Sequence, residues 1–302
     1  MHQWLQLLSR HNAGTILMNE PLSRYTTWKI GGPADAVVIP DTREQLMSLM
    51  TFIREHRLPW MQIGRGSNML VSDKGIRGIV IKLGDGFDQT AFQEDGTVTA
   101  GGAVSLVKLS VLAGKQALSG LEFAGGIPGS VGGAVYMNAG AHGSDVSRIF
   151  KSAEVVLETG ELVKYGPEEM EFRYRHSVLH ERRGIVISAE LQLERGDRGE
   201  INTALAAYKE RRRQTQPLQL PCAGSVFRNP PGDHAARLIE AAGLKGLKAG
   251  GAEISTQHAN FIINTGQAKA EDVLTLIRHV QHTIRSQNGV ELVPEVFVVG
   301  EL

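Results

Sequence analysis

The sequence is poor in cysteine, with one residue, Cys222, in 302. A single thiol excludes an internal disulfide framework and a zinc site built from cysteines, and it suits a reducing compartment. An excess of charge of either sign is also lacking, because 32 basic residues balance 32 acidic ones. A neutral chain has no global field that attracts nucleic acid or an anionic membrane, so an anionic ligand must be bound by local groups. We therefore expect a cytoplasmic protein with no nucleic-acid partner.

A long apolar run is missing as well. The longest uncharged stretch, 123–144, has the length of a bilayer span, but it is filled with glycine and also contains Pro128 and Asn138. Such a composition argues against a membrane span. The first twelve residues lack an apolar core of signal-peptide length and indicate an amphipathic helix, so no export signal is expected.

Glycine, in contrast, is abundant, with 35 residues. This is well above the roughly 7% of average proteins. Hydrophobic periodicity divides the chain into three segments, 1–85, 86–198 and 199–302, and the glycines gather at loops in the first two. In the first segment, Asp41 with Glu44 three residues later predicts the N-terminal cap of a helix. The pattern as a whole predicts two glycine-bearing α/β segments followed by a smaller α+β segment.

The first glycine loop is Ile63–Leu70, IGRGSNML, which follows a predicted strand directly. Glycines here let backbone N–H groups approach a phosphate or a flat ring. The loop is not the G-x-G-x-x-G dinucleotide fingerprint, since Met69 stands where glycine is needed, and the chain has no P-loop motif. For one such loop taken alone, a tight turn at the exit of the strand is the preferred explanation.

The second glycine loop, 123–144, is harder to explain by packing alone. Each glycine inside an element costs about 0.5 to 1 kcal/mol relative to alanine. Donors from this loop and from the start of a following helix are predicted to surround a pyrophosphate, with Asn138 meeting a polar ring edge. A glycine-lined helix crossing is the alternative. Two such loops suggest a large dinucleotide.

The two loops together resemble the paired flavin-binding loops of the vanillyl-alcohol-oxidase superfamily. The segments TTWKIGGPAD, EFAGGIPGSVGGAVYMNAGAHG, FRYRHS, AGSVFRNP, ISTQHANFIIN and LVPEVFVVG follow one another in the order found in one of its families, the UDP-N-acetylenolpyruvoylglucosamine reductases. The resemblance covers nearly the whole chain. It implies an α+β protein with a two-subdomain FAD-binding fold (1–85 and 86–198) and a smaller α+β substrate-binding domain (199–302).

The resemblance also implies an activity. In this family NADPH reduces non-covalently bound FAD, and hydride then passes from N5 of the flavin to the CH₂ carbon of UDP-N-acetylglucosamine enolpyruvate, which gives UDP-N-acetylmuramate for peptidoglycan. Arg175, Ser225 and Glu295 match the catalytic positions. Arg175 would stabilise the developing negative charge, Ser225 would protonate the α-carbon, and Glu295 would help to polarise the substrate carboxylate. Taken singly, each residue has an ordinary structural explanation.

Further site residues are expected around these three. The predicted FAD contacts are Gly64, Arg65, Gly66, Ser67, Asn68, Met69, Leu70, Gly125, Gly126, Ile127, Pro128, Gly129, Ser130, Gly133, Asn138, Gly140 and Arg213. For Arg213, a solvated helix end is equally plausible. The predicted substrate contacts are Tyr174, Arg228, Asn229, Lys245, His258 and Asn260.

Two alternative functions stay open. One is another flavin oxidase or dehydrogenase of the same fold, with FAD attached covalently, for which His142 is the residue to examine. Another is a passive nucleotide-binding module without redox chemistry. His176 and His180 have a metal-ligand spacing, but no third ligand accompanies them, so no metal is predicted. Cys222 lacks a neighbouring base motif and is expected to be a bystander.

Overall fold

The chain forms two compact units in a computed structural model that describes residues 3–301. The first unit consists of the chain through Met18 together with Ala36–Arg65 and Gly78–Glu210. The second consists of Asn19–Asp35, Gly66–Arg77 and the chain from Arg211 onward. The three-segment division by sequence stays a prediction. Long-range pairing, which periodicity does not reveal, joins two short N-terminal segments to the C-terminal unit.

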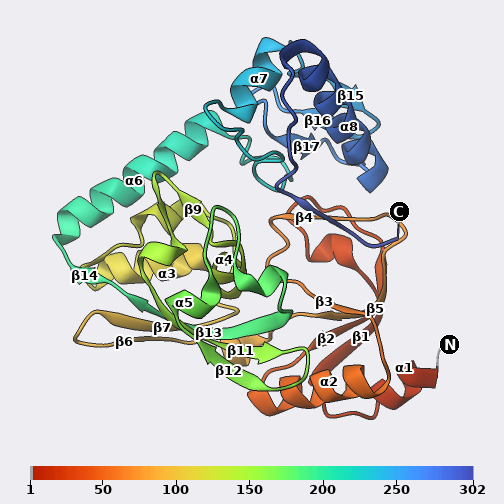
Figure 1. Cartoon of the computed structure of the whole chain (residues 1–302), viewed down its shortest axis with the longest axis vertical. Coiled ribbons are helices and arrows are strands. Elements are labelled where there is room, and N and C mark those ends of the chain that lie inside the picture. The colour runs from red at the N-terminus through yellow and green to blue at the C-terminus, as the bar shows by residue number, and fades with distance from the viewer. Residues whose placement is uncertain (1–2, 302) are drawn as a thin grey trace. The chain divides into compact units, whose positions relative to one another are not determined.

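The chain passes from one unit to the other within three strands of a four-stranded sheet (Figure 1). Its strands in spatial order are β1 (Thr15–Pro21), β2 (Pro33–Ile39), β5 (Ile76–Ile81) and β3 (Trp60–Gln62). Helix α2 (Arg43–Glu55) buries Leu46, Leu49 and Ile53 in the core that this sheet forms. The short helix α1 (Gln3–Leu8) adds Leu8 to the same core.

The predicted helix at 41–57 is confirmed, but its cap is not Asp41. The helix begins at Arg43, and the Thr42 side chain accepts the N–H of Gln45. The N–H of Asp41 is bound in turn by the side chain of Gln45. Both Asp and Thr are good caps, so composition alone did not fix the register.

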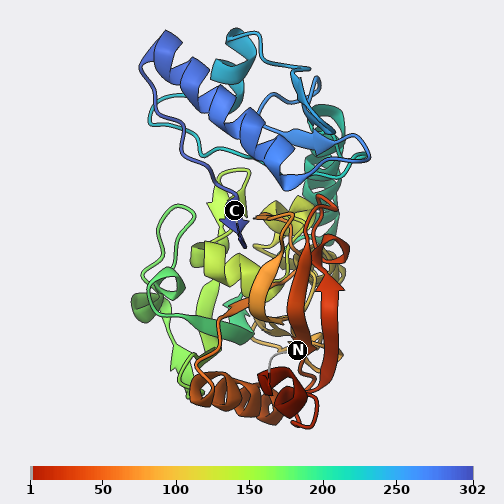
Figure 2. The same ribbon diagram turned by 90° about the vertical axis from the view of Figure 1, so that its right-hand side faces the viewer.

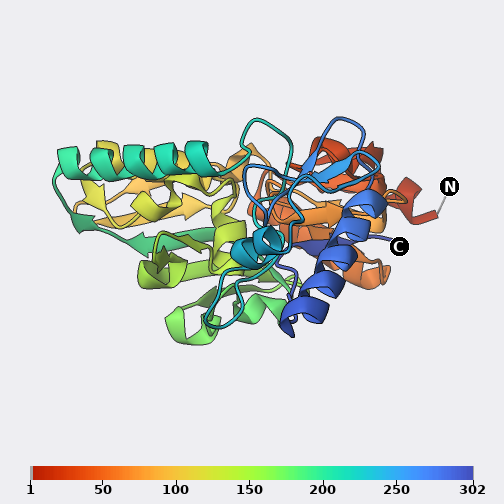
Figure 3. The ribbon, with the colours of Figure 1, turned by 90° about the horizontal axis from the view of Figure 1, so that it is seen from above.

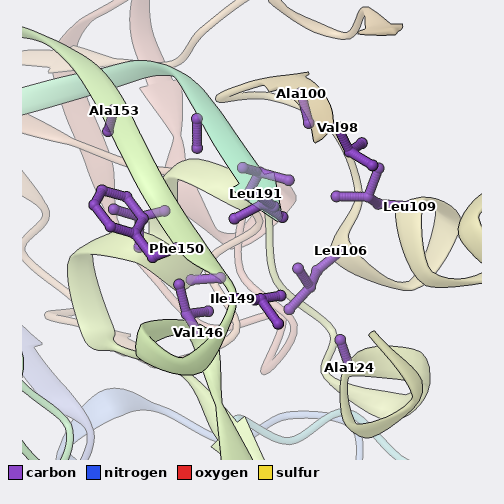
Figure 4. Packing of buried hydrophobic residues seen from close by; sticks show 14 of the residues in the cluster. Val98, Ala100, Leu106, Leu109, Ala124, Val146, Ile149, Phe150, Ala153 and Leu191 are labelled. Atoms are coloured by element: carbon purple, nitrogen blue, oxygen red, sulfur yellow. The ribbon is translucent and has the colours of Figure 1, made fainter. Parts of the chain in front are cut away.

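An antiparallel sheet forms the centre of the first unit. Its strands in spatial order are β12 (Leu162–Tyr165), β11 (Phe150–Leu157), β13 (Gly184–Gln192), β7 (Thr97–Gly101) and β6 (Thr90–Phe92). Helices α3 (Leu106–Lys115), α4 (Val131–Met137) and α5 (Pro167–Met170) accompany it, with two short pairs, β8 (Leu118–Ser119) with β14 (Glu194–Arg195) and β9 (Gly140–Ala141) with β10 (Ser144–Asp145). Figure 4 shows the packed core, in which Leu106 and Leu109 lie near Val98 and Leu191.

The second unit is built on a three-stranded sheet and helix α8 (Ala270–Asn288). The sheet consists of β15 (Lys248–Ala249), β16 (Ala252–Ile254) and β17 (Ile262–Asn264), and Figure 2 shows α8 lying against it. Helix α7 (Ala235–Ala241) and the parallel pair β4 (Met69–Val71) and β18 (Phe297–Val299) complete the unit. Val273, Ile277, Val280 and Ile284, whose spacing of three and four residues is typical of one helical face, are buried in its core.

Trp28 explains why an N-terminal segment belongs to this unit. Its indole is fully buried, and its Nε1 donates to the carbonyl of Ile262 at 2.7 Å. The side chain of Asn264 donates to the carbonyl of Trp28 at 3.0 Å. A buried indole needs such a partner for its N–H.

Helix α6 (Arg198–Thr215) is a single uninterrupted helix (Figure 3) that begins in the first unit and ends in the second. Its N-terminal part packs closely on the first unit, because a Cβ on Gly114 would lie 3.2 Å from Leu205 and 3.3 Å from Ile201. Among residues 3–301, no helix is both long and apolar enough to cross a membrane.

Candidate flavin and substrate site

The first glycine loop, Ile63–Leu70, is tightly constrained and rich in available donors. Gly66 has φ of +60°, and a Cβ there would lie 2.1 Å from the carbonyl oxygen of Tyr25. Only glycine tolerates both conditions. Within the described chain, the backbone N–H groups of the four consecutive residues 64–67 have no hydrogen-bond acceptor. Because unpaired N–H groups are costly when buried, these four are suited to an anionic ligand.

The second glycine loop differs from this expectation at the start of α4. The N–H of Val131 is bound by the Val104 carbonyl, that of Gly132 by the Gly102 carbonyl, and that of Gly133 by Ser130 Oγ. The prediction that the start of the helix supplies donors to a pyrophosphate is therefore wrong for these three groups. A Cβ on Gly132 would lie 3.0 Å from the Val186 carbonyl oxygen, so this glycine serves close packing.

Gly129 is the glycine of the second loop that the protein itself does not explain. Its φ is not positive, and a Cβ added there would meet nothing within 4 Å. Gly125, in contrast, faces Leu205, whose Cδ2 would lie 2.7 Å from an added Cβ. The space beside Gly129 is thus available to a ligand.

The two loops meet inside the first unit. A Cβ on Gly64 would lie 2.7 Å from Ser130 Oγ, which belongs to the second loop and caps α4. Gly64 is therefore required where the loops touch. The sequence suggested a pair of loops from separate segments, and the structure brings Gly64 and Ser130 into contact.

Arg175 is held against the second loop. One guanidinium nitrogen donates to the carbonyl of Gly140 at 2.8 Å, and the guanidinium lies 5.1 Å from the ring centre of Tyr174. Mutual hydrogen bonds between Arg173 and His176 close a tight turn around Tyr174 and Arg175. Arg175 has φ of +53°, a conformation that favours glycine at this turn position. A strained arginine kept at a glycine position indicates a functional requirement for its side chain.

Asn138 stabilises this arrangement. Its Nδ2 donates to the Arg173 carbonyl at 3.0 Å, and its Oδ1 accepts the N–H of Ser147 at 2.9 Å. Its φ of +42° ends α4. The predicted cofactor contact of Asn138 stays a prediction, and the described contacts give its amide a main-chain role.

In the second unit, hydrogen bonds connect Glu295 with Val226, the residue after Ser225, and with Asn68 of the first glycine loop. The N–H of Glu295 donates to the carbonyl of Val226, the residue after Ser225, at 2.7 Å. Asn68 Nδ2 donates to the Glu295 carbonyl at 3.1 Å, and the Asn68 carbonyl accepts the N–H of Phe297 at 3.0 Å. Met69 and Leu70 continue as β4, paired with β18. Two predicted catalytic residues are thus tied to the segment 66–70.

The other residues predicted to contact substrate lie in both units. Tyr174, in the first, is 56% exposed. In the second, Arg228 has a buried Nε without a hydrogen-bond partner in the described chain, and Asn229 Oδ1 accepts the N–H of Ala235. An unpartnered buried guanidinium nitrogen is suited to an anionic group of a ligand.

Lys245 and His258 lie in the second unit, where the charge of Lys245 acts on His258. Lys245 Nζ binds Glu240 Oε1 at 2.7 Å. Burial lowers the pKa of His258, and the charge of Lys245 lowers it further. His258 Nδ1 accepts the N–H of Asn260 at 3.2 Å, which leaves the proton of the neutral ring on Nε2. The Asn260 side chain is engaged with the main chain of Phe227.

Several residues singled out by sequence have other contacts. The His142 ring stacks on Tyr208 at 3.9 Å, and His176 Nε2 lies 3.2 Å from Glu181 Oε1. Within residues 3–301, no group of three or more His, Cys, Asp or Glu side chains could hold a metal. Burial raises the pKa of the Cys222 thiol, which makes it less reactive. Arg213 lies near the end of α6, where its carbonyl is within 3.3 Å of Gln257 Nε2.

Comparison with known proteins defines first the class and then the family. A model described as an FAD binding domain matches residues 34–166. A solved berberine bridge enzyme variant, a reticuline dehydrogenase, has a similar fold, with a TM-score of 0.50 at 13% identity over 65% of this chain and 44% of its own. The chain is a flavin-dependent oxidoreductase, and the predicted α+β fold of the vanillyl-alcohol-oxidase type is confirmed.

A second model, the C-terminal domain of UDP-N-acetylenolpyruvoylglucosamine reductase, matches residues 216–299. The reductase of that name from Anoxybacillus flavithermus is 54% identical over 301 residues, which is 99% of each chain. The crystal structure of the MurB enzyme from Thermus caldophilus superimposes with a TM-score of 0.80 at 38% identity, covering 94% of this chain and 98% of that one. The chain belongs to the family of UDP-N-acetylenolpyruvoylglucosamine reductases.

The residues present fit the FAD that this family implies. Residues 64–67 offer consecutive N–H donors, and the open side of Gly129 has no other explanation in the chain. Sequence reasoning found these loops but missed the residues that shape them. Tyr25, whose carbonyl confines Gly66, lies forty residues upstream, and no local pattern connects the two.

Proposed function

We propose that this protein reduces UDP-N-acetylglucosamine enolpyruvate to UDP-N-acetylmuramate at the expense of NADPH, in the cytoplasmic synthesis of peptidoglycan precursors. Membership of the reductase family supports the proposal. The observation that carries it is that Glu295 is hydrogen-bonded both to Val226, the residue after Ser225, and to Asn68 of the first glycine loop. Non-covalently bound FAD would supply the hydride carrier between NADPH and the substrate carbon.

Arg175 would contribute the charge that the reaction requires. Addition of hydride to the CH₂ carbon leaves negative charge on the α-carbon and the attached carboxylate. A permanently charged, planar donor stabilises that charge more than it stabilises the substrate, which is the condition for catalysis. The strained backbone of Arg175 and its hydrogen bond to Gly140 support this role, because they fix the guanidinium in one place.

Ser225 would give its hydroxyl proton to the α-carbon, and Glu295 would bind near the substrate carboxylate. A serine hydroxyl is a weak acid, so its position must be well defined. The hydrogen bond from the N–H of Glu295 to the Val226 carbonyl keeps the two segments in register. Arg228, with its buried unpartnered Nε, would bind an anionic group of the sugar nucleotide.

The substitution Ser225→Ala tests the proposal in two half-reactions, followed by anaerobic stopped-flow absorbance of the flavin. We expect reduction by NADPH to proceed as in the wild type, since no substrate proton is involved. Reoxidation by the enolpyruvyl sugar nucleotide should slow by about 10² to 10⁴, the usual contribution of a positioned acid. Ser286→Ala, on an exposed turn of α8, is the matched control and should change neither rate.

Other outcomes identify the alternatives. Flavin that stays in the pellet after acid precipitation would indicate covalent attachment, as in an oxidase, and rapid reoxidation by oxygen would support that activity. Flavin that NADPH does not bleach would indicate a passive binder. Equal loss of both half-reactions in Ser225→Ala would contradict the proton-donor role and indicate damaged flavin binding instead.

A further inference from the structure

The chain around Ser225 has no continuous strand partner. Cys222–Arg228 belongs to none of the named strands and meets its neighbours at isolated bridges, Cys222 with Ile263 and Phe227 with Pro294. Gly224, directly before Ser225, has φ of +75° and nothing within 4 Å of an added Cβ. A segment without a ladder of hydrogen bonds needs other restraints if it is to hold a reactive hydroxyl in place.

Asn260 supplies these restraints on one side. Its Oδ1 accepts the N–H of Phe227 at 2.9 Å, and its Nδ2 donates to the Phe227 carbonyl at 2.8 Å. Its own carbonyl accepts the N–H of Val226 at 2.9 Å. Asn260 is only 4% exposed. The side-chain amide of Asn260 therefore binds the N–H and the carbonyl of Phe227 as the peptide group of an adjacent strand would. Only one orientation of the amide places its oxygen at the N–H and its nitrogen at the carbonyl.

The opposite side of the segment is held by the chain before β18. The N–H of Glu295 donates to the Val226 carbonyl at 2.7 Å, and the N–H of Arg228 donates to the Val293 carbonyl at 2.9 Å. Val226 is thus bound from both sides, and both main-chain groups of Phe227 depend on the side chain of Asn260.

We propose that Asn260 is a positioning residue, which fixes the hydroxyl of Ser225 and its register with Glu295 by acting as a substitute strand for Phe227. The inference rests on the proposed function, in which Ser225 protonates the substrate. It gives Asn260 a task other than contact with the substrate.

The test is Asn260→Asp, which keeps the shape of the side chain but changes its hydrogen bonding with pH. An ionised carboxylate still accepts the N–H of Phe227, but it faces the Phe227 carbonyl without a proton to donate. A protonated carboxyl restores both hydrogen bonds, and burial favours that neutral form. At pH 8 we expect reoxidation by the enolpyruvyl sugar nucleotide to be at least tenfold slower than in the wild type, which corresponds to about 1.4 kcal/mol. The rate should recover as the pH falls.

The rate is measured by stopped flow between roughly pH 5.5 and 8 and divided by the wild-type rate at each pH. Reduction by NADPH, measured on the same samples, should match the wild type throughout. Asn260→Ser is the second variant if the aspartate does not fold. Its hydroxyl makes at most part of the pair, so reoxidation should slow without any recovery in acid.

Asn264→Asp is the matched control. Asn264 is also 4% exposed and also joins main-chain groups, since its Nδ2 donates to the Trp28 carbonyl and its Oδ1 accepts the N–H groups of Gly266 and Ala268. It should lower stability without slowing reoxidation selectively.

Three results decide the matter. Asn260→Asp that slows both half-reactions alike, or that shows no recovery in acid, would overturn the positioning role. Asn260→Ser with wild-type reoxidation would also overturn it. A wild-type enzyme that the enolpyruvyl sugar nucleotide does not reoxidise would instead refute the proposed function, which keeps the two failures distinct.

Discussion

The two glycine loops are both rich in glycine but use it for different purposes. In the first, Gly66 is confined by the Tyr25 carbonyl and four successive N–H groups have no acceptor in the described chain. In the second, the first three N–H groups of α4 are bound by the protein, and Gly132 permits close packing against Val186 and Gly102. Gly129 and Gly143 there face open space, and of these two Gly129 has no positive φ that would require glycine.

This difference shows that a glycine-rich motif does not by itself locate donors for a phosphate. A glycine can be required by a positive φ, by a neighbouring backbone, or by a ligand, and these causes separate only when the surroundings are known. The first loop is expected to bind FAD through N–H groups, and the second mainly by leaving room. Three substitutions, ordered by their expected effect on the stability of the apoprotein, test this division.

Gly66→Ala should have the largest effect. The left-handed conformation costs an alanine about 1 kcal/mol, and the Tyr25 carbonyl 2.1 Å from the new Cβ adds a backbone clash, so we expect a loss of roughly 3 kcal/mol in unfolding free energy. The purified protein should also contain no flavin. Urea unfolding and the visible spectrum measure the two effects.

Gly243→Ala is the control for Gly66→Ala. Gly243 has φ of +73° but nothing within 4 Å of an added Cβ, so its substitution measures the conformational cost without the clash. If Gly66→Ala is no more destabilising than Gly243→Ala and still binds flavin, the Tyr25 carbonyl does not confine Gly66 as the structure indicates.

Gly132→Ala should have an intermediate effect. Alanine is the better helix former by about 1 kcal/mol, but the new methyl group would lie 3.0 Å from the Val186 carbonyl oxygen and 3.1 Å from that of Gly102, and such overpacking costs about 1 to 3 kcal/mol. We expect a net loss near 1 kcal/mol with unchanged FAD affinity. Thermal unfolding of the apoprotein and flavin titration check both.

Gly133→Ala provides the comparison in the same helix. Its added methyl group would meet only Ser130 Oγ, at an ordinary 3.4 Å, so the apoprotein should be as stable as the wild type or more so. For Gly132→Ala, the contradicting outcome is unchanged stability of the apoprotein together with weaker FAD binding. That result would show that the start of α4 does bind the cofactor.

The features predictable from sequence are those that depend on local periodicity and local motifs. The stripe Val273, Ile277, Val280 and Ile284 is buried as its spacing indicated, and both glycine loops were located by their motifs. The cap of α2 was misplaced by one residue, because Asp is the better intrinsic cap but Thr42 is the residue whose side chain accepts the N–H of Gln45. The local signal identifies the element, but neighbouring groups decide the register.

Features that depend on distant residues could not be predicted. The indole of Trp28 binds the carbonyl of Ile262, 234 positions away, and this contact helps to join the segment 19–35 to the second unit. Asn260 was expected to line a pocket because it lies in a polar motif near His258. Its side chain pairs with Phe227 in a segment that belongs to no named strand, and that pairing has no local sequence signature.

Gly129→Ala should have the smallest effect on the apoprotein and the opposite sign. Neither φ nor any protein atom opposes a methyl group there, so reduced freedom of the unfolded chain should stabilise the apoprotein by about 0.4 to 1 kcal/mol. If the cofactor occupies the open side of Gly129, the methyl group takes its place. FAD affinity should then fall about tenfold, or 1.4 kcal/mol. Flavin titration and the rise in melting temperature caused by added FAD measure this. A variant that is stabilised but binds FAD as tightly as the wild type would remove the second loop from the cofactor site and leave the first loop to bind it alone.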